Sequence, residues 1–176
     1  MNKALPTAII VGIEHFVAKK LAKILLSKDI NVIGVGEYAV GFEEEKNYDY
    51  RIGLDEVSEK VSYVFDFGGK EETWNLALRN GAKLTVVSVN KKNISRVEIE
   101  KLKAREEGWR LVEAFGVYGP EMEEDGFLAA AIRQAVRNEN LELPQVGEVF
   151  RLLSREDCVE AILRASFLSG TEGEIF

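Results

Sequence analysis

Residues 7–18 read TAIIVGIEHFVA, an apolar run followed by a glycine and then by the start of an amphipathic pattern. Thr7 to Val11 has the length and the apolar character of a buried strand, and Gly12 follows it directly. Apolar residues then recur at helical spacing between Ala18 and Ser27. This region therefore predicts a strand, a tight turn and a helix.

A strand, a glycine turn and a helix form the first half of a Rossmann unit, whose helix N-terminus attracts a pyrophosphate. The dinucleotide fingerprint has small residues at the positions that Gly12, His15 and Ala18 hold here. Gly12 and Ala18 suit it, but His15 puts an imidazole where the backbone would approach the phosphates. As the only histidine, His15 could donate to a phosphate, or it could mark a turn that no longer admits one.

Short apolar runs alternate with helical patterns along the rest of the chain, which favours a parallel sheet with helices on both faces. The predicted strands are Ala8–Val11, Asn31–Val35, Tyr50–Ile52, Val61–Phe67, Lys83–Ser88 and Trp109–Phe115. The predicted helices are Phe16–Ser27, Glu71–Asn80, Ser95–Glu107, Gly126–Asn138 and Arg155–Leu168. We expect one α/β domain over residues 1–176, a doubly wound α/β/α sandwich with strand order 3-2-1-4-5-6.

The composition narrows the classes of partner and compartment. A net charge of −7 argues against nucleic acid or an anionic membrane as the main partner, because both need a basic surface. Cys158 is the only cysteine, so an internal disulfide and a Cys/His metal site are excluded, and we expect no metal. We expect a cytoplasmic protein, because the N-terminus has no apolar stretch that would suit a signal or a membrane span.

Several segments, taken in order, resemble the extended short-chain dehydrogenase/reductase family, the NAD-dependent nucleotide-sugar epimerases and dehydratases. The most specific of them is Phe115-Gly-Val-Tyr-Gly-Pro120, which is similar to that family's Asn-Val-Tyr-Gly-Pro signature. The other similar segments are Gly12–Ala18, Val61–Gly69, Val86–Ser88, Gly126–Asn138, Phe150–Arg151, Glu156–Ile162 and Gly173–Phe176. The resemblance implies an NAD-binding domain that lacks most of the C-terminal part that completes the family's sugar site. It also implies that Gly173–Phe176 begins a strand.

The family's catalytic tyrosine and lysine are replaced in this chain, according to the resemblance. Lys92 stands at the tyrosine position and Arg96 at the lysine position, while the serine position falls near Val89 or Asn90. A lysine offers no phenol, and an arginine beside it disfavours a proton-bearing cation. We therefore predict that the family's chemistry is lost and that the domain has no catalytic residues.

The resemblance also identifies candidate cofactor residues, which are Gly12, His15, Phe16, Glu37, Gly68, Gly69 and Ser88. Glu37 follows the family's ribose-binding position at Gly36, and it either accepts from a ribose hydroxyl, favouring NAD over NADP, or is a solvated charge. Gly68-Gly69 either lies flat against a nucleotide or turns into the next helix. We expect Asp66 to repel the pyrophosphate electrostatically. NAD binding is therefore expected to be weak or absent.

Tyr118 and Arg151 are the candidate substrate-binding residues, at the signature turn and at the family's diphosphate-binding arginine. Tyr118 also reads as a packing residue, and Arg151 as a surface charge. Ser154 and Asp157 form a capping box for the last helix.

Three functions remain open: a non-catalytic binding or assembly module, an active nucleotide-sugar enzyme, and a nucleotide sensor. Motif loss favours the first. We expect a monomer or a weak dimer, because two helices use their apolar residues to cover the sheet. Those residues are Val97, Ile99, Leu102 and Ala104 in one helix, and Phe127, Leu128, Ala131, Ile132, Ala135 and Val136 in the other.

Overall fold

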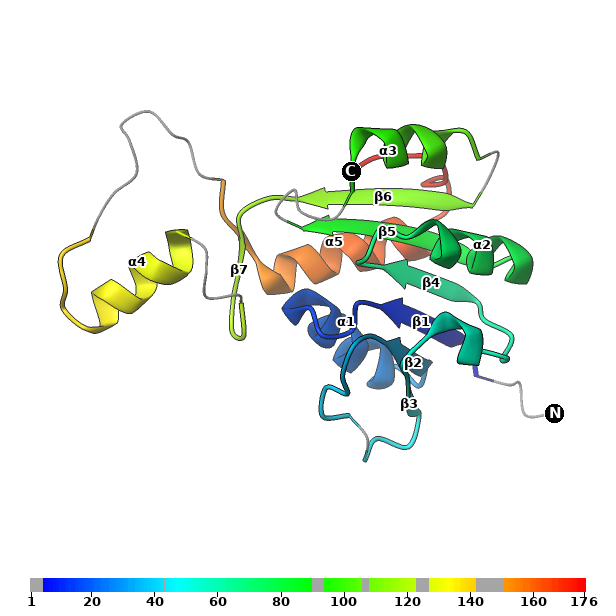
Figure 1. Ribbon diagram of the computed structural model, residues 1–176, viewed down its shortest axis with the longest axis horizontal. Helices are drawn as coiled ribbons and strands as arrows, with labels where there is room; N and C mark the ends of the chain where they lie inside the picture. Colours follow the sequence, from blue (N-terminus) through cyan, green and yellow to red (C-terminus); the bar gives the residue numbers. More distant parts are fainter. Residues whose placement is uncertain (1–4, 43, 90–93, 106–107, 123–126, 142–150) are drawn as a thin grey trace.

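A computed structural model describes residues 5–42, 44–89, 94–105, 108–122, 127–141 and 151–176 (Figure 1). Its strands are β1 (Thr7–Val11), β2 (Asn31–Val35), β3 (Tyr48–Arg51), β4 (Tyr63–Asp66), β5 (Lys83–Val89), β6 (Trp109–Ala114), β7 (Val117–Tyr118) and β8 (Leu153–Ser154). Its helices are α1 (Phe16–Leu26), α2 (Glu71–Asn80), α3 (Arg96–Lys103), α4 (Phe127–Val136) and α5 (Arg155–Phe167), with a 3-10 turn η1 (Leu54–Glu56).

Six parallel strands form the main sheet in the order β3-β2-β1-β4-β5-β6. Ile9 in β1 lies opposite Ile33 in β2 and Val64 in β4, so the central strands meet through apolar residues at their middle. A strand that is covered on both faces needs apolar residues on both of them. The predicted Rossmann-like fold class and strand order are confirmed.

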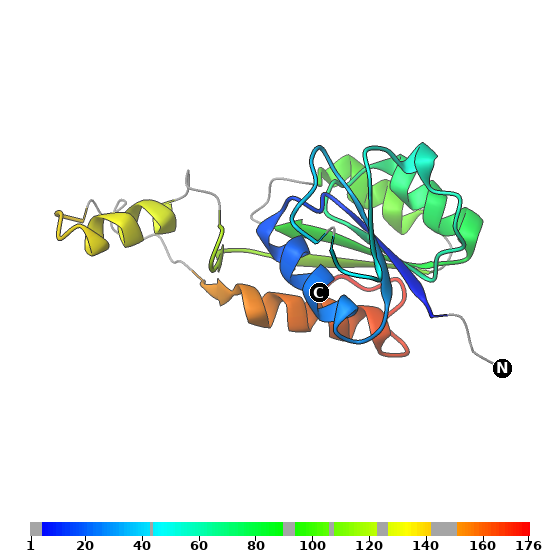
Figure 2. The ribbon, with the colours of Figure 1, turned by 90° about the horizontal axis from the view of Figure 1, so that it is seen from below.

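Helices cover both faces of this sheet, giving the expected three layers (Figure 2). The core on one face includes Leu21 of α1 and Ile162 of α5, both fully buried. The core on the other face includes Trp74 of α2 and Leu102 of α3. Ser154 begins α5 as predicted, since its hydroxyl accepts a hydrogen bond from the Asp157 amide at 3.0 Å. No helix within the described residues has the length and apolarity to cross a membrane.

The last residues of the chain lie against the free edge of β6. The Phe176 amide donates to the Leu111 carbonyl at 2.9 Å, and Ile175 forms a parallel bridge with Leu111. The prediction that Gly173–Phe176 begins a strand is therefore correct. The strand predicted at Tyr50–Ile52 is β3, which begins two residues earlier, at Tyr48, because Tyr48 is the first residue that pairs with β2, opposite Val32.

A buried arginine connects β6 to this terminal segment. The Arg110 side chain is inaccessible to solvent, its Nε donates to Thr171 Oγ1 at 2.9 Å, and its Nη2 pairs with the Glu172 carboxylate. Thr171 in turn donates to the Ala165 carbonyl at 2.8 Å. One guanidinium therefore holds the connection between α5 and the terminal strand.

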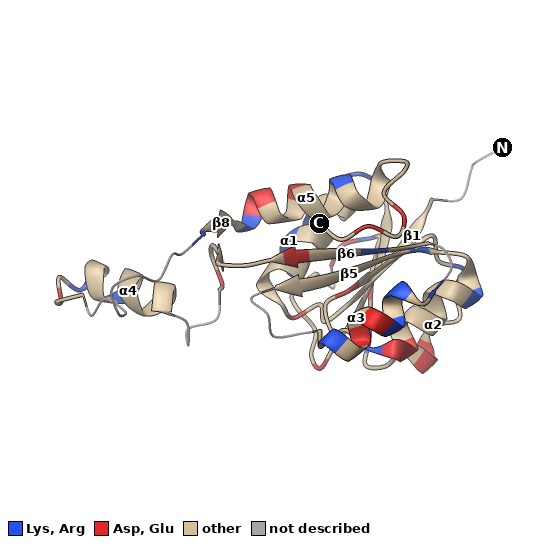
Figure 3. Ribbon diagram, turned by 90° about the horizontal axis from the view of Figure 1, so that it is seen from above, with Lys and Arg blue, Asp and Glu red and all other residues tan. Residues whose placement is uncertain are grey.

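The expectation that α4 buries its apolar stripe was wrong. Ala129 is the one buried residue among its ten, whereas Ile132 is 43% exposed and Val136 is 79% exposed. The helix projects beyond the carboxyl edge of the sheet, away from the layers that cover it (Figures 1 and 3). An amphipathic pattern identifies a helix but does not identify what the apolar face packs against.

The expectation for α3 was half right. Leu102 is fully buried and Ile99 packs against the same core, but Val97 is 67% exposed and Ala104 is also exposed. The helix ends at Lys103, and only the narrow side that carries Ile99 and Leu102 contacts the sheet, so two residues cover it rather than four.

Candidate functional site

The turn after β1 brings Gly12 against the end of β4 at the carboxyl edge of the sheet. Gly12 has a φ of +78°, a left-handed conformation that favours glycine. A Cβ at this position would also lie 3.1 Å from the Phe67 Cβ, so a larger residue would have to displace Phe67. Gly12 is therefore required both by the turn and by the packing of Phe67.

Two rings of the chain itself lie over this turn. The His15 and Phe67 rings stack with their centroids 5.5 Å apart and their planes 26° from parallel. His15 also caps α1, since its Nδ1 accepts a hydrogen bond from the Val17 amide at 3.2 Å. The imidazole thus engages one of the amides that a helix N-terminus would otherwise offer to an anion. The Phe16 side chain is 4% exposed and belongs to the core beneath α1.

Asp66 ends β4, and the prediction that it repels a pyrophosphate does not fit its surroundings. Its carboxylate is fully buried, with Oδ1 accepting from the amides of Gly68 and Gly69 at 2.9 and 3.0 Å. Its Oδ2 accepts from the Trp74 indole at 2.7 Å. The carboxylate therefore fixes its own loop and the first turns of α2. Gly68-Gly69 is a turn into that helix, with both amides already engaged.

Burial raises the pKa of Asp66 to about 6, against hydrogen bonds from Gly68, Trp74, Gly69 and Lys70 that lower it. Between the ordinary value of 3.8 and this value, the folded state holds a proton that the unfolded state has released. The contribution of Asp66 to the free energy of unfolding therefore falls as pH rises through that window.

We expect Asp66→Asn, which cannot ionise, to remove this pH dependence. The free energy of unfolding of the wild type minus that of the variant falls by at most about 3 kcal/mol between pH 4 and pH 7. Urea denaturation at pH 4, 5.5 and 7 measures it, and Asp55→Asn in η1 controls for the loss of one exposed charge. A difference that does not change with pH would show that Asp66 is ionised throughout.

An acid from the glycine turn, Glu14, lies against the end of β2, and the sequence did not identify it as a site residue. Glu37, the predicted ribose acid, is exposed, whereas the half-buried Glu14 carboxylate from the glycine turn lies against Gly36. Any Cβ at Gly36 would overlap that carboxylate. Glu14 Oε2 is buried and makes no hydrogen bond within the described part of the chain. A buried carboxylate oxygen without a donor is costly unless a ligand supplies one.

Tyr50 of β3 completes this corner of the site. Its hydroxyl donates to the Gly36 carbonyl at 2.9 Å. Burial, and after it the Glu14 and Glu56 carboxylates, raise the pKa of Tyr50 above its ordinary value, so the phenol stays protonated. Glu14, Gly36 and Tyr50 thus form an acceptor-rich corner, which we call the β2 corner.

The backbone segments that carry the two candidate substrate residues, Tyr118 and Arg151, lie close together, and both side chains are exposed. Tyr118 in β7 is 37% exposed, and β7 pairs with β8, which begins two residues after the exposed Arg151. A Cβ at Gly116, whose φ is +63°, would overlap the Arg151 carbonyl oxygen. The fold therefore brings the Tyr118 turn and the Arg151 segment together, although they are over thirty residues apart in sequence.

Arg155 is the residue that holds this turn, and the sequence analysis did not identify it. Its side chain is 11% exposed, and its Nη1 donates to the Pro120 carbonyl at 3.0 Å. Lys19 of α1 pairs with Glu121 at 3.2 Å from the other side. The signature turn is therefore fixed to both α5 and α1, next to the glycine turn.

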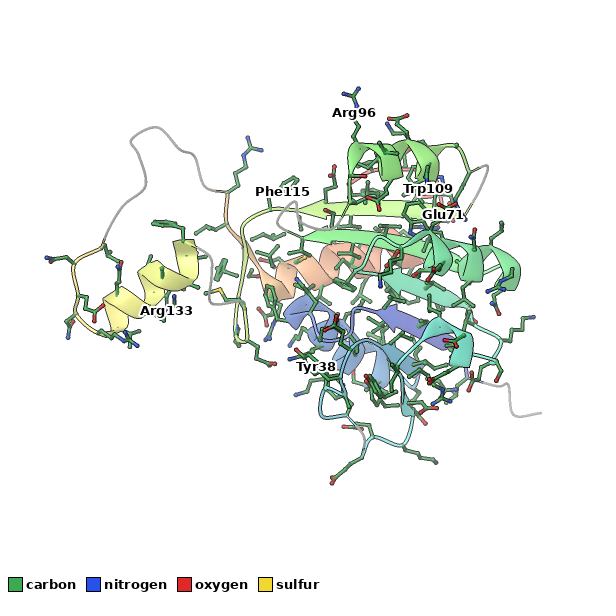
Figure 4. The ribbon with its side chains drawn as sticks, viewed as in Figure 1. Tyr38, Glu71, Arg96, Trp109, Phe115 and Arg133 are labelled. Carbon is green, nitrogen blue, oxygen red and sulfur yellow. The ribbon has the colours of Figure 1, made fainter. Side chains whose placement is uncertain are left out.

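Of the remaining predicted residues, those that the structure describes do not gather at the site. Ser88 is buried within β5, and Lys92 and Asn90 lie outside the described residues. Arg96 is exposed at the start of α3, and its side chain projects away from the sheet (Figure 4). At the place of the family's lysine, the described chain therefore has a solvated guanidinium.

Solved structures share this fold. The chain is similar to a dTDP-glucose 4,6-dehydratase from Bacillus anthracis in complex with NAD, with 15% identity, a TM-score of 0.79, and coverage of 97% of this chain and 74% of the other. It is similar to a UDP-glucose 4-epimerase with UDP-glucose from Thermotoga maritima, with 16% identity, a TM-score of 0.76, and coverage of 97% and 75%. An epimerase from Methanothermobacter thermautotrophicus gives 15% identity, a TM-score of 0.75, and coverage of 98% and 71%.

No family model matches the chain, and no curated protein matches it. At such low identity the structural similarity establishes a common Rossmann-like fold.

Proposed function

We propose that this chain is a non-catalytic domain of the NAD-dependent epimerase/dehydratase type. It serves as a binding or assembly module and has a reduced affinity for the dinucleotide. One observation carries the proposal, which is the hydrogen bond from the Val17 amide to His15 at the glycine turn. A pyrophosphate in a Rossmann site is held by free amides at this helix N-terminus. Here the histidine engages one of them and its ring covers the turn together with Phe67.

The residues at the carboxyl edge fit one half of NAD and not the other. The Glu14 carboxylate of the β2 corner has an oxygen with no hydrogen-bond donor among the described residues, which suits the hydroxyls of an adenosine ribose and repels a 2′-phosphate. Where the pyrophosphate would lie, the amides of Val17, Gly68 and Gly69 already donate to side chains of the chain itself, to His15 and to Asp66. The adenosine half of a nucleotide is therefore the part that this domain retains, and NAD is favoured over NADP.

The absence of catalysis is proposed from the residues at the family's catalytic positions. Arg96 is a solvated cation and Lys92 has no phenol, so neither supplies the acid/base group that the resemblance implies. We further propose a monomer or weak dimer in the reduced cytosol, without a metal. The exposed face of α4 is available to a protein partner or to an attached domain.

The β2 corner makes a prediction for two glutamates. In a His15→Gly background, Glu14→Gln is expected to weaken NAD binding about tenfold, because the ribose hydroxyls lose a charged acceptor. Glu37→Gln in the same background is expected to leave the affinity unchanged, because the Glu37 side chain is exposed to solvent. Calorimetric titration of both variants measures it. An effect of Glu37→Gln with none of Glu14→Gln would restore Glu37 as the ribose acid.

Turnover and bound nucleotide test the proposed function. Purified protein is expected to carry no nucleotide, so its 260/280 nm absorbance ratio does not fall after denaturation and filtration. Incubation with NAD and UDP-glucose or dTDP-glucose is expected to leave both sugar nucleotides unchanged by chromatography. Formation of an epimer or of a 4-keto sugar would establish the alternative, an active enzyme. A tightly retained nucleotide without turnover would instead establish a sensor.

A further inference from the structure

A second hollow lies at the opposite, amino edge of the sheet. A cavity of about 520 Å³ lies between the C-terminal end of α2 and the starts of β5 and β6, and its lining includes Trp74, Leu78, Ala82, Leu84, Arg105 and Trp109. Small-molecule sites commonly have volumes of this size and mainly apolar walls. The glycine turn follows the carboxyl end of β1, so this cavity lies at the edge opposite the candidate nucleotide site, and Trp74 reaches that site through its hydrogen bond to Asp66.

The cavity has rigid aromatic walls and an open mouth. Trp74 and Trp109 are 1% and 5% exposed, and their indole nitrogens donate to Asp66 and to the Arg105 carbonyl. At Gly81 and Gly108 an added Cβ would meet nothing within 4 Å. A flat ligand could therefore enter beside these glycines without moving the backbone.

Among the described residues that line the cavity, Arg105 is the charged one. Arg105 lies over the Trp74 ring at 5.6 Å, and its Nη2 donates to Asn75 Oδ1 at 2.8 Å. Its Nε and Nη1 make no hydrogen bond to any residue that the structure describes. No acidic residue is among the described residues that line the cavity.

The nearest acid of α2 is already paired. Glu71 bonds to Lys101 of α3 at 2.9 Å, and α2 and α3 lie on the same face of the sheet (Figure 3). Arg105 is therefore a cation held in place at the rim of an aromatic cavity, and its Nε and Nη1 can donate to a ligand.

We propose that this cavity binds a small planar aromatic anion, a ring that bears a carboxylate or sulfonate. The ring packs on the apolar and indole walls, and the acid group accepts a hydrogen bond from the Arg105 guanidinium, at Nε or at Nη1. An aliphatic acid lacks the stacking, and a neutral ring lacks the charge-assisted hydrogen bonds. The proposal is independent of the nucleotide site.

The two tryptophans report binding directly, because they are the only ones in the chain and both line the cavity. We use 1-naphthoate as the probe and 1-naphthamide as its neutral match, and follow the two indole N–H signals by NMR. Both signals are expected to shift, with naphthoate binding at least about tenfold more tightly than naphthamide.

Variants separate the charge from the walls. Arg105→Gln is expected to abolish the preference for naphthoate, Arg105→Lys to keep part of it, and Leu78→Ser to weaken both ligands. His15→Asn, at the other edge, leaves both affinities unchanged, and an unaltered unfolding midpoint confirms that each variant folds. The proposal is overturned if neither indole signal shifts at millimolar naphthoate, or if the two ligands bind equally well. Neither outcome bears on NAD binding, which is read at other residues.

Discussion

His15→Gly is expected to raise the affinity for NAD by about tenfold or more. The substitution removes the ring that stacks on Phe67, and it frees the Val17 amide that the imidazole now accepts from. Both changes restore the turn that a pyrophosphate requires, a small residue beside an uncapped helix N-terminus. Calorimetry with NAD on variant and wild type measures the effect.

His15→Asn is the matched control for this experiment. Asparagine is a good N-cap, so it keeps an acceptor for the helix amide while it removes the ring. We expect a smaller gain than for glycine, and the difference between the two variants measures the cost of the engaged amide. If neither variant binds NAD more tightly than the wild type, His15 is not what weakens the turn.

Arg110→Ala is expected to lower the free energy of unfolding by about 3 kcal/mol, a loss comparable to that of other large buried side chains. The substitution empties the space of a fully buried side chain and releases Thr171 and Glu172, which hold the terminal strand against β6. For a domain of this size the melting temperature falls by roughly 6–12 °C.

Two further variants identify the origin of that loss. Arg110→Met keeps much of the buried stem but not the hydrogen bonds, so about half of the loss is expected. Arg96→Ala, at an exposed position, changes the stability by about 0.5 kcal/mol or less in urea denaturation. Equal stability of wild type and Arg110→Ala would show that the terminal strand does not depend on this guanidinium.

The fold could be predicted from the sequence because its signals are local. Ala8–Val11 is apolar throughout and Leu84–Val87 is apolar except for Thr85, as suits strands buried on both faces, and the intervening helices show the 3.6-residue period. Right-handed crossovers then leave little choice of strand order. The turn chemistry of Gly12 and the cap at Ser154 are local in the same way.

The details of the site could not be predicted in that way, because they depend on contacts between distant segments. Glu14 lies at the end of β2 only because the turn after β1 folds over Gly36. Phe67 lies on His15 only because β4 is the neighbour of β1. Arg110 reads as a surface charge until its partners, sixty residues later, fold onto β6. The one available signal was Phe67 itself, an aromatic residue directly after the strand-end acid.

The claim that the glycine turn no longer admits a pyrophosphate is tested most directly by calorimetric titration of the wild-type protein with NAD. With His15 and Phe67 over the glycine turn and the Val17 amide engaged, we expect little heat at millimolar NAD. A saturable heat with a dissociation constant in the micromolar range would contradict this account. It would mean that the histidine donates to the phosphates instead of closing the turn on them.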